Sequence, residues 1–216
     1  MNWRGYRTKA RFGGLYFALE RVDLVKRRMT AHRLRDNLPP DLPIAIVGQV
    51  IDLMSRNSVG NIVNAIKRAE DHFGIGVGLI CFDTWAKGIA AGGGDESSAK
   101  DQNVALANLR RVLDSVNAHI ATIGHTGKDE SRGERGSNAK LADVDLQVQL
   151  SGETIRSAII KKANDQPEGV LTSLRLEPYE FGLDEDGDQS RTFIVSIDNV
   201  TAVPVTKQKL AIEMPR

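Results

Sequence analysis

The sequence has almost no cysteine, no excess of either charge and no long hydrophobic run. Its only cysteine, Cys81, excludes a disulfide within the chain and favours a reducing compartment. A net charge of +1 gives no overall attraction to nucleic acid or membrane, so any such affinity must come from local patches. No apolar run approaches the roughly 18 residues of a membrane span, and no charged-then-apolar leader is present. We therefore expect a cytoplasmic protein without a signal peptide.

The composition that is present is ordinary for a globular protein. Of the 216 residues, 41% are hydrophobic and 26% are charged, which is enough to build one good core. One or two domains fit this length.

Short apolar segments alternate with segments of helical apolar spacing over the first 125 residues. The apolar segments predict buried strands at 14–19, 44–47, 79–83 and 120–124. Apolar residues at three- and four-residue spacing predict helices at 22–33, 59–73 and 104–116. The stretch from Thr84 to Ser98 is predicted to be a loop, with Ser97 or Ser98 as the N-cap of the next helix. This strand–helix–strand alternation predicts a parallel sheet with right-handed crossovers.

A polar side chain follows each of three predicted strands: Glu20, Asp83 and His125. The carboxyl ends of parallel strands meet at one edge of a sheet, where ligands bind in open α/β folds. Four apolar residues ending in Asp83 form the Walker B pattern, whose carboxylate holds the water shell of a nucleotide-bound magnesium ion. Alternatively, such an aspartate only caps the following helix. Together the three residues provide a possible base for water, a metal ligand and a sensor of a terminal phosphate.

The pattern changes after His125. Residues 126–140 are polar and rich in glycine, which predicts a loop. Alternating residues at 144–150 and 154–162, with a Ser-Gly turn between them, predict a hairpin. Two further strands are predicted at 171–181 and 192–197. The chain should therefore end in an antiparallel β extension.

Six motifs in this order resemble the signature of the RecA-like AAA-type ATPases of the RepA replicative helicase group, common in plasmids, phages and prophages. They are Tyr16–Glu20 (YFALE), Ile80–Thr84 (ICFDT), Gly93–Asp101 (GGDESSAKD), His125–Asp129 (HTGKD), Arg135–Ser137 (RGS) and Glu185–Asp188 (EDGD). The resemblance runs from about Gly14 to Val195. It implies an α/β fold with a RecA-like parallel sheet flanked by helices, formed by residues 1–143, and a C-terminal antiparallel β extension of the same domain, residues 144–216.

The resemblance also implies roles for single residues. Glu20 would orient the attacking water, Asp83 would bind magnesium through water, and His125 would sense the γ-phosphate. Thr84 would lie with Asp83 at the nucleotide, and Lys162 would reach the nucleotide of a neighbouring subunit. The family uses ATP and Mg²⁺, handles single-stranded DNA and forms homo-oligomers, here expected to be a hexameric ring. Four basic residues of the 126–140 loop would contact the DNA: Lys128, Arg132, Arg135 and Lys140.

The chain departs from the family pattern at the phosphate-binding loop. No Gly-x-x-x-x-Gly-Lys-Ser/Thr pattern occurs in the 216 residues. The only Gly-Lys pair, Gly127-Lys128, has Thr122 at the first glycine position and Asp129 after the lysine. The phosphate cradle, its lysine and the hydroxyl that binds magnesium are thus missing. We expect ATP and Mg²⁺ to be used only when a P-loop is restored.

Smaller departures lie beside the implied site residues. Gly124 stands where the family often has a histidine before His125, and Asn164 stands where a second basic residue often follows Lys162. Arg21 follows Glu20 where glycine is frequent.

Two alternative functions remain open at this point. The chain could be a non-catalytic assembly or single-stranded-DNA-binding module on the same fold, which the missing P-loop favours. It could also be a metal-dependent hydrolase using Asp83, Asp95 and His125, although these residues lack the close spacing of typical metal ligands.

Overall fold

A computed structural model describes residues 2–3, 6–7, 9–125, 139–183 and 185–196. Its centre is a four-stranded parallel sheet made of β3 (Gly13–Ala18), β4 (Ile44–Val47), β5 (Val77–Asp83) and β6 (His119–Ile123), in the order β4-β3-β5-β6. The predicted strands and their parallel pairing are confirmed. Strand β6 ends at Ile123, so His125 lies two residues beyond it rather than at its last position.

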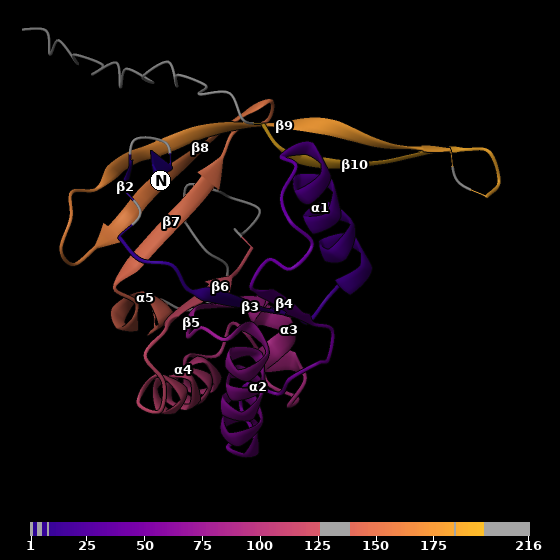
Figure 1. Cartoon of the computed structure of the whole chain (residues 1–216). Coiled ribbons are helices and arrows are strands. Elements are labelled where there is room, and N and C mark those ends of the chain that lie inside the picture. Colours follow the sequence, from indigo (N-terminus) through magenta and orange to yellow (C-terminus); the bar gives the residue numbers. More distant parts are fainter. Residues whose placement is uncertain (1, 4–5, 8, 126–138, 184, 197–216) are drawn as a thin grey trace, which may run out of the picture.

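Helices lie on both sides of this sheet (Figure 1). One face is covered by α2 (Asn57–Phe73), α3 (Trp85–Ala90) and α4 (Ala99–Leu113), whereas α1 (Val22–Arg35) lies on the opposite side. Parallel strands are normally covered on both faces, so this arrangement suits the nearly continuous apolar runs of the strands. The predicted fold class is confirmed.

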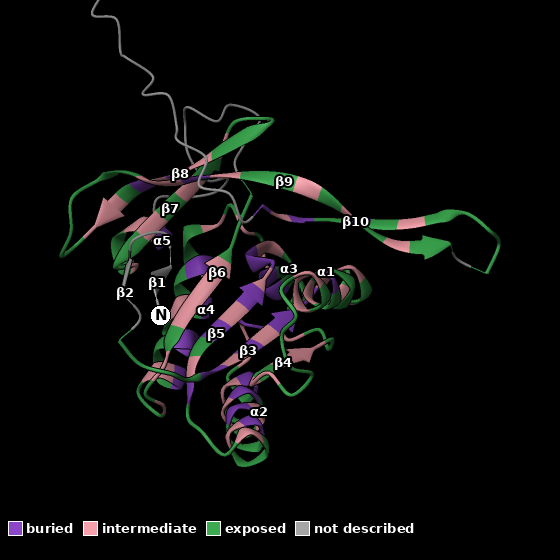
Figure 2. Ribbon diagram, turned by 45° about the horizontal axis from the view of Figure 1, so that its top comes forward, coloured by how far each residue is buried: buried purple, intermediate pink, exposed green. Residues whose placement is uncertain are grey.

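The core forms where β3 and β5 face α2 and α4, and Figure 2 shows buried residues concentrated on these two central strands. The rings of Phe17 and Phe82 stack with centroids 4.8 Å apart and planes at 6°. The helical stripe expected at 59–73 supplies Ile62, Ile66 and Ala69 to the same cluster. Burial of apolar side chains between the sheet and these helices therefore stabilises the sheet. The carboxyl edge of the same sheet carries the predicted site.

The prediction of a loop from Thr84 to Ser98 is wrong over residues 85–90, which form α3. Trp85 and Ile89 are spaced four residues apart and are both buried, so one turn of helix places them in the core together. Gly88 makes close packing possible, because a Cβ atom there would lie 2.5 Å from Cδ1 of Leu53. Glycine has a low helix propensity, so Gly88 makes a helix hard to predict from the local sequence. Packing in the tertiary structure outweighs this low propensity.

The C-terminal strands form a second, antiparallel sheet in the order β10-β9-β8-β7. They are β7 (Leu146–Ser151), β8 (Ile155–Ala163), β9 (Gly169–Leu183) and β10 (Gln189–Val195). The predicted hairpin and the two further strands are confirmed, with β9 and β10 longer than expected because their outer ends pair with each other. Figure 1 shows this sheet above the parallel sheet, with the β9–β10 hairpin extending past α1.

Three short elements complete the described structure. The helix α5 (Ala139–Asp143) precedes β7 and connects the two sheets along the chain. Near the N-terminus, β1 (Asn2–Trp3) pairs with β2 (Tyr6–Arg7) in an antiparallel manner. In the described part of the chain, no helix has the length and apolar character needed to cross a membrane.

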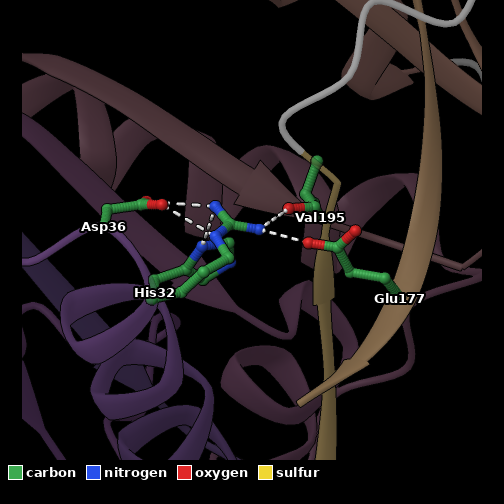
Figure 3. A network of polar contacts seen from close by, with 5 residues as sticks. His32, Asp36, Glu177 and Val195 are labelled. Atoms are coloured by element: carbon green, nitrogen blue, oxygen red, sulfur yellow. Dashed lines mark hydrogen bonds and ion pairs between the residues drawn. The ribbon is translucent and has the colours of Figure 1, made fainter.

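A polar cluster around Arg35 joins α1 to the C-terminal sheet (Figure 3). The guanidinium donates to Asp36 from Nε at 2.7 Å and from Nη2 at 3.0 Å. Its Nη1 donates to Glu177 at 2.9 Å and to the carbonyl oxygen of Val195 at 2.5 Å, and Nη2 lies 3.3 Å from Nδ1 of His32. One half-buried side chain thus bonds the end of α1 to both β9 and β10.

Candidate functional site

Strand register brings the three predicted strand-end residues to one edge of the parallel sheet. Ala18 of β3 pairs with Asp83 of β5, and Asp83 pairs with Ile123 of β6. The amide of the residue after β3, Leu19, donates to the carbonyl oxygen of Asp83 at 2.7 Å. Glu20 and His125 therefore follow the two strands that flank Asp83, each two residues beyond the strand end.

The carboxylate of Asp83 has a partner that sequence reasoning missed. The hydroxyl of Tyr16 donates to Oδ2 of Asp83 at 2.5 Å. Burial, followed by the hydrogen bond and the negative charge of Asp83, raises the pKa of Tyr16 well above its ordinary value of 10.0. Tyr16 is opposite Cys81 in the register, so Tyr16 and Asp83 project from the same face of the sheet. The one indication of this bond in the sequence is a tyrosine, an aromatic residue with a hydroxyl group, within an otherwise apolar strand.

The thiol of Cys81 lies on that same face. Burial, with a further contribution from the charge of Asp83, raises the pKa of the Cys81 thiol to about 12. A thiol with so high a pKa forms little of the reactive thiolate at neutral pH. Cys81 is therefore poorly reactive in this position.

Glu20 lies in the turn between β3 and α1. Its Oε1 is 3.6 Å from Nε of Arg21, whose side chain is 75% exposed, so this ion pair contributes little to stability. Arg21 has φ of 52° and ψ of 47°, which is the left-handed region that glycine adopts most easily. This conformation explains why glycine suits the position after the glutamate.

Thr84 caps a helix in this structure. It is buried, and its hydroxyl accepts a hydrogen bond from the amide of Lys87 at 3.4 Å, at the N-terminus of α3. The peptide bond between Asp83 and Thr84 is cis. His125, in contrast, is exposed. Its exposed imidazole is accessible to a ligand at this edge.

The prediction that Lys140 belongs to the 126–140 loop and contacts DNA is wrong. Lys140 lies in α5 and is 6% exposed, with its ammonium 4.8 Å from the ring centroid of Trp85. Its amide donates to Oε1 of Gln102 at 3.1 Å. The aromatic face of Trp85 attracts the cation and the helix fixes its position, so Lys140 is not presented to DNA. The other three residues of the predicted DNA-binding set, Lys128, Arg132 and Arg135, lie outside the described residues.

Lys162 binds the opposite end of α5. Its ammonium donates to the carbonyl oxygen of Leu141 at 2.5 Å and lies 3.4 Å from that of Ala142. A cation at the last carbonyl groups of a helix satisfies their free acceptors and interacts favourably with the helix dipole. Lys140, through Trp85 of α3, and Lys162 of β8 thus hold α5 between these two elements. Whether Lys162 also reaches a neighbouring subunit stays a prediction.

The three ligands of the alternative metal-dependent hydrolase do not come together. Among the residues that the structure describes, no group of three His, Cys, Asp or Glu side chains could hold one metal ion. Asp95 instead accepts a hydrogen bond from the amide of Ser97 at 2.8 Å, which stabilises the turn before α4. The described structure therefore gives no support to the alternative in which Asp83, Asp95 and His125 bind one metal ion.

Comparison with known proteins decides the family. The model of the AAA domain family matches residues 1–131. The chain belongs to this family. RecA-like ATPases of this kind generally bind ATP and Mg²⁺. No curated protein matches the sequence.

Two solved structures are similar to this chain. The crystal structure of the RadB recombinase is similar at 14% identity and a TM-score of 0.53, over 77% of this chain and 76% of that one. A KaiC-like protein from the hyperthermophilic archaeon Pyrococcus horikoshii OT3 is 16% identical with a TM-score of 0.47, over 86% of this chain and 76% of the other. The similarity to the RadB recombinase shows that this AAA domain has a RecA-like α/β fold.

Proposed function

We propose that this AAA domain is the ATPase core of a RepA-type DNA helicase or replication protein, of the kind common on plasmids and phages, and that it couples ATP hydrolysis to DNA unwinding or loading. The observation that supports this most is the position of Glu20, Asp83 and His125 after three neighbouring parallel strands, at one sheet edge. An acid for water, a carboxylate for the metal and an imidazole near the phosphate are the groups that hydrolysis of a nucleotide requires there.

The chemistry of Asp83 fits a magnesium ion held through water. Mg²⁺ keeps several of its waters and is bound through one or two carboxylates together with substrate phosphates. Asp83 is partly exposed at the sheet edge, and the hydrogen bond from Tyr16 uses only its Oδ2. Bound magnesium would neutralise charge that develops on the phosphates. Oδ1 of Asp83 would accept from a metal-bound water, and Glu20 would accept from the attacking water.

The phosphates need a cradle that residues 1–216 do not supply. Backbone N–H groups of a glycine-rich loop, a lysine and a hydroxyl carry this task in P-loop enzymes, and the sequence pattern for them is absent. We therefore propose that ATP and Mg²⁺ are used only when a phosphate-binding loop is supplied to this domain.

The experiment that tests the function compares two polypeptides for magnesium-dependent release of phosphate from ATP. We expect the 216-residue chain to release none above background. The same chain preceded by a strand, P-loop and helix, on the order of 30 residues or more, should be active. Hydrolysis by the 216-residue chain that survives Asp83→Asn would show that these strand-end residues do not carry the chemistry.

We propose that the protein assembles as a homo-oligomeric ring, in which Lys162 contributes to the nucleotide of the adjacent subunit. The non-catalytic alternative is an assembly or single-stranded-DNA-binding module on the same fold, and the absent P-loop pattern favours it. The two proposals differ in one measurement. The module would bind oligonucleotide with no dependence on ATP, whereas the ATPase core would bind in a nucleotide-dependent manner.

The segment 126–138 is proposed to contact single-stranded DNA through Lys128, Arg132 and Arg135. Its glycines allow a backbone to approach phosphates, but acidic residues lower its net charge and it has no aromatic for base stacking. Affinity from one copy should be weak and salt-dependent, so several subunits must contribute.

For this segment, Arg132→Ala with Arg135→Ala in the assembled, P-loop-bearing protein should weaken binding of a labelled oligonucleotide. The slope of log affinity against log salt should also become shallower, by roughly the amount that one to two phosphate contacts contribute. Fluorescence anisotropy measures both. Arg68→Ala with Arg110→Ala, two exposed arginines on α2 and α4, is the charge-matched control. If the affinity and the slope are unchanged in Arg132→Ala with Arg135→Ala, this segment does not bind DNA.

A further inference from the structure

The hydroxyl of Tyr16 lies in surroundings that otherwise favour a purely apolar side chain. Tyr16 lines an apolar groove between α1 and the sheet, together with Met29, Ile46 and Cys81. A phenylalanine would fill this space equally well, and the neighbouring strand position already carries Phe17. A hydroxyl in apolar surroundings costs free energy unless it is hydrogen-bonded. Its partner is Oδ2 of Asp83, 2.5 Å away and 67 residues later in the sequence.

The main effect of this hydrogen bond is to fix the orientation of the Asp83 carboxylate, rather than to hold the fold together. Tyr16 and Asp83 stand on adjacent, directly paired strands of a rigid sheet, so the donor and acceptor are held at a constant spacing. A bond to one oxygen limits rotation of the carboxylate about its side-chain torsion. The other oxygen, Oδ1, then keeps one orientation at the edge of the sheet.

The donor is also neutral. The ordinary pKa of a tyrosine phenol is about 10, so the donor keeps its proton at physiological pH. A lysine or arginine in the same place would orient the carboxylate too, but its positive charge would repel a divalent cation. A phenol orients Asp83 and leaves its full negative charge available to the metal.

We propose that Tyr16 is the positioning residue of the magnesium-binding carboxylate: it holds Oδ2 of Asp83 so that Oδ1 accepts from the water shell of the ion. This inference rests on the proposed role of Asp83 in magnesium binding. It assigns to Tyr16 a function in metal affinity that a residue of the core would not have. Orienting groups behind a metal-binding side chain are typically worth 10- to 100-fold in metal affinity.

The first arm of the experiment tests the hydrogen bond in the 216-residue chain. A phenolic proton that is held in a hydrogen bond and shielded from water exchanges slowly, so proton NMR at neutral pH can detect it. We expect such a signal in the wild type, and we expect it to be absent in Tyr16→Phe and shifted or lost in Asp83→Asn, because the charged acceptor is removed. A wild-type spectrum without this signal would overturn the inference without bearing on the ATPase proposal.

The second arm uses the P-loop-bearing polypeptide with bound ADP, because the metal is expected only there, and Mn²⁺ as a paramagnetic probe in place of magnesium. Line broadening of backbone amide signals at residues 18–19 and 83–84 reports the ion near the sheet edge. In the wild type, broadening should be centred there and should be abolished by Asp83→Asn. Tyr16→Phe should require on the order of tenfold more Mn²⁺ for the same broadening. The matched control is Tyr179→Phe, which removes a hydroxyl from the β9–β10 hairpin.

The outcomes separate the two proposals. If Tyr16→Phe binds Mn²⁺ as the wild type does while Asp83→Asn does not, the metal role of Asp83 stands and the positioning role of Tyr16 is overturned. If the wild type shows no broadening at this edge, the metal role itself is wrong and the positioning role falls with it. A thermal unfolding curve of Tyr16→Phe close to that of the wild type shows that a weaker Mn²⁺ effect is not caused by loss of structure.

Discussion

ATP turnover by the P-loop-bearing polypeptide should fall on the order of a hundredfold or more when Glu20 is replaced by glutamine. Glutamine has nearly the same size but cannot take up a proton from the attacking water. Asp83→Asn should lower turnover to a similar extent, because a neutral amide binds the water shell of a divalent cation much more weakly than a carboxylate. Steady-state phosphate release at saturating ATP measures both effects.

Charge-matched controls come from the same chain. Glu180→Gln changes an exposed acid on the β9–β10 hairpin, and Asp41→Asn changes an exposed acid in the loop before β4. Both should leave turnover unchanged, since neither lies at the carboxyl edge of the parallel sheet. Additional magnesium should partly restore Asp83→Asn but not Glu20→Gln, because only the first loss concerns metal affinity. Near-normal turnover in both site variants would contradict the assignment of this edge as the active site.

Loss of the Arg35 guanidinium should reduce the free energy of unfolding by about 2–3 kcal/mol, the range for a half-buried group that makes charged hydrogen bonds. Arg35→Met keeps most of the side-chain volume while it removes every bond to Asp36, Glu177 and the carbonyl of Val195. Glu177 would then keep its charge without this partner. Urea unfolding followed by circular dichroism measures the change, and Arg27→Met on the exposed face of α1 is the control.

The same variant tests whether residues 144–216 extend the domain formed by residues 1–143, as we propose. If they do, urea unfolding of the wild type shows one cooperative transition, and Arg35→Met shifts it as a whole. A double-mutant cycle with Glu177→Gln isolates the bond between α1 and β9. Two separate transitions in the wild type, with Arg35→Met affecting only one, would show that the C-terminal sheet is an independent unit.

The Arg35 cluster also predicts how stability depends on pH. Burial, and then the positive charge of Arg35, lowers the pKa of His32 below its ordinary 6.5, so the unfolded chain takes up this proton first on acidification. Stability should therefore fall as pH decreases below about 6.5. The Arg35 hydrogen bond lowers the pKa of Asp36 below 3.8, and that contribution is lost below this value. Arg35→Met should reduce the pH dependence due to Asp36 more than the pH dependence due to His32. The reason is that burial, not Arg35, is the main cause of the lowered pKa of His32.

The sequence by itself determined the sheet and the positions of Glu20, Asp83 and His125. An apolar run of strand length must be buried, helices between such runs make the strands parallel, and the carboxyl ends of parallel strands meet at one edge. These rules need only local periodicity and chain order, which is why the strand register agrees with the predicted arrangement. The missing phosphate cradle is equally a property of the sequence, because it depends on one contiguous pattern.

Only the tertiary structure decided what the side chains around that edge contact. Lys140 has the sequence context of a solvated loop, yet the face of Trp85, 55 positions earlier, binds its ammonium. Asp83 and Tyr16 are likewise far apart along the chain, and only their register in the folded sheet makes the hydroxyl a donor to the carboxylate. Local patterns carry no information on contacts of this kind, because their free energy depends on burial and on pairing between distant segments. Sequence pattern therefore locates the edge of the sheet, and long-range packing selects which of its polar groups are held in place.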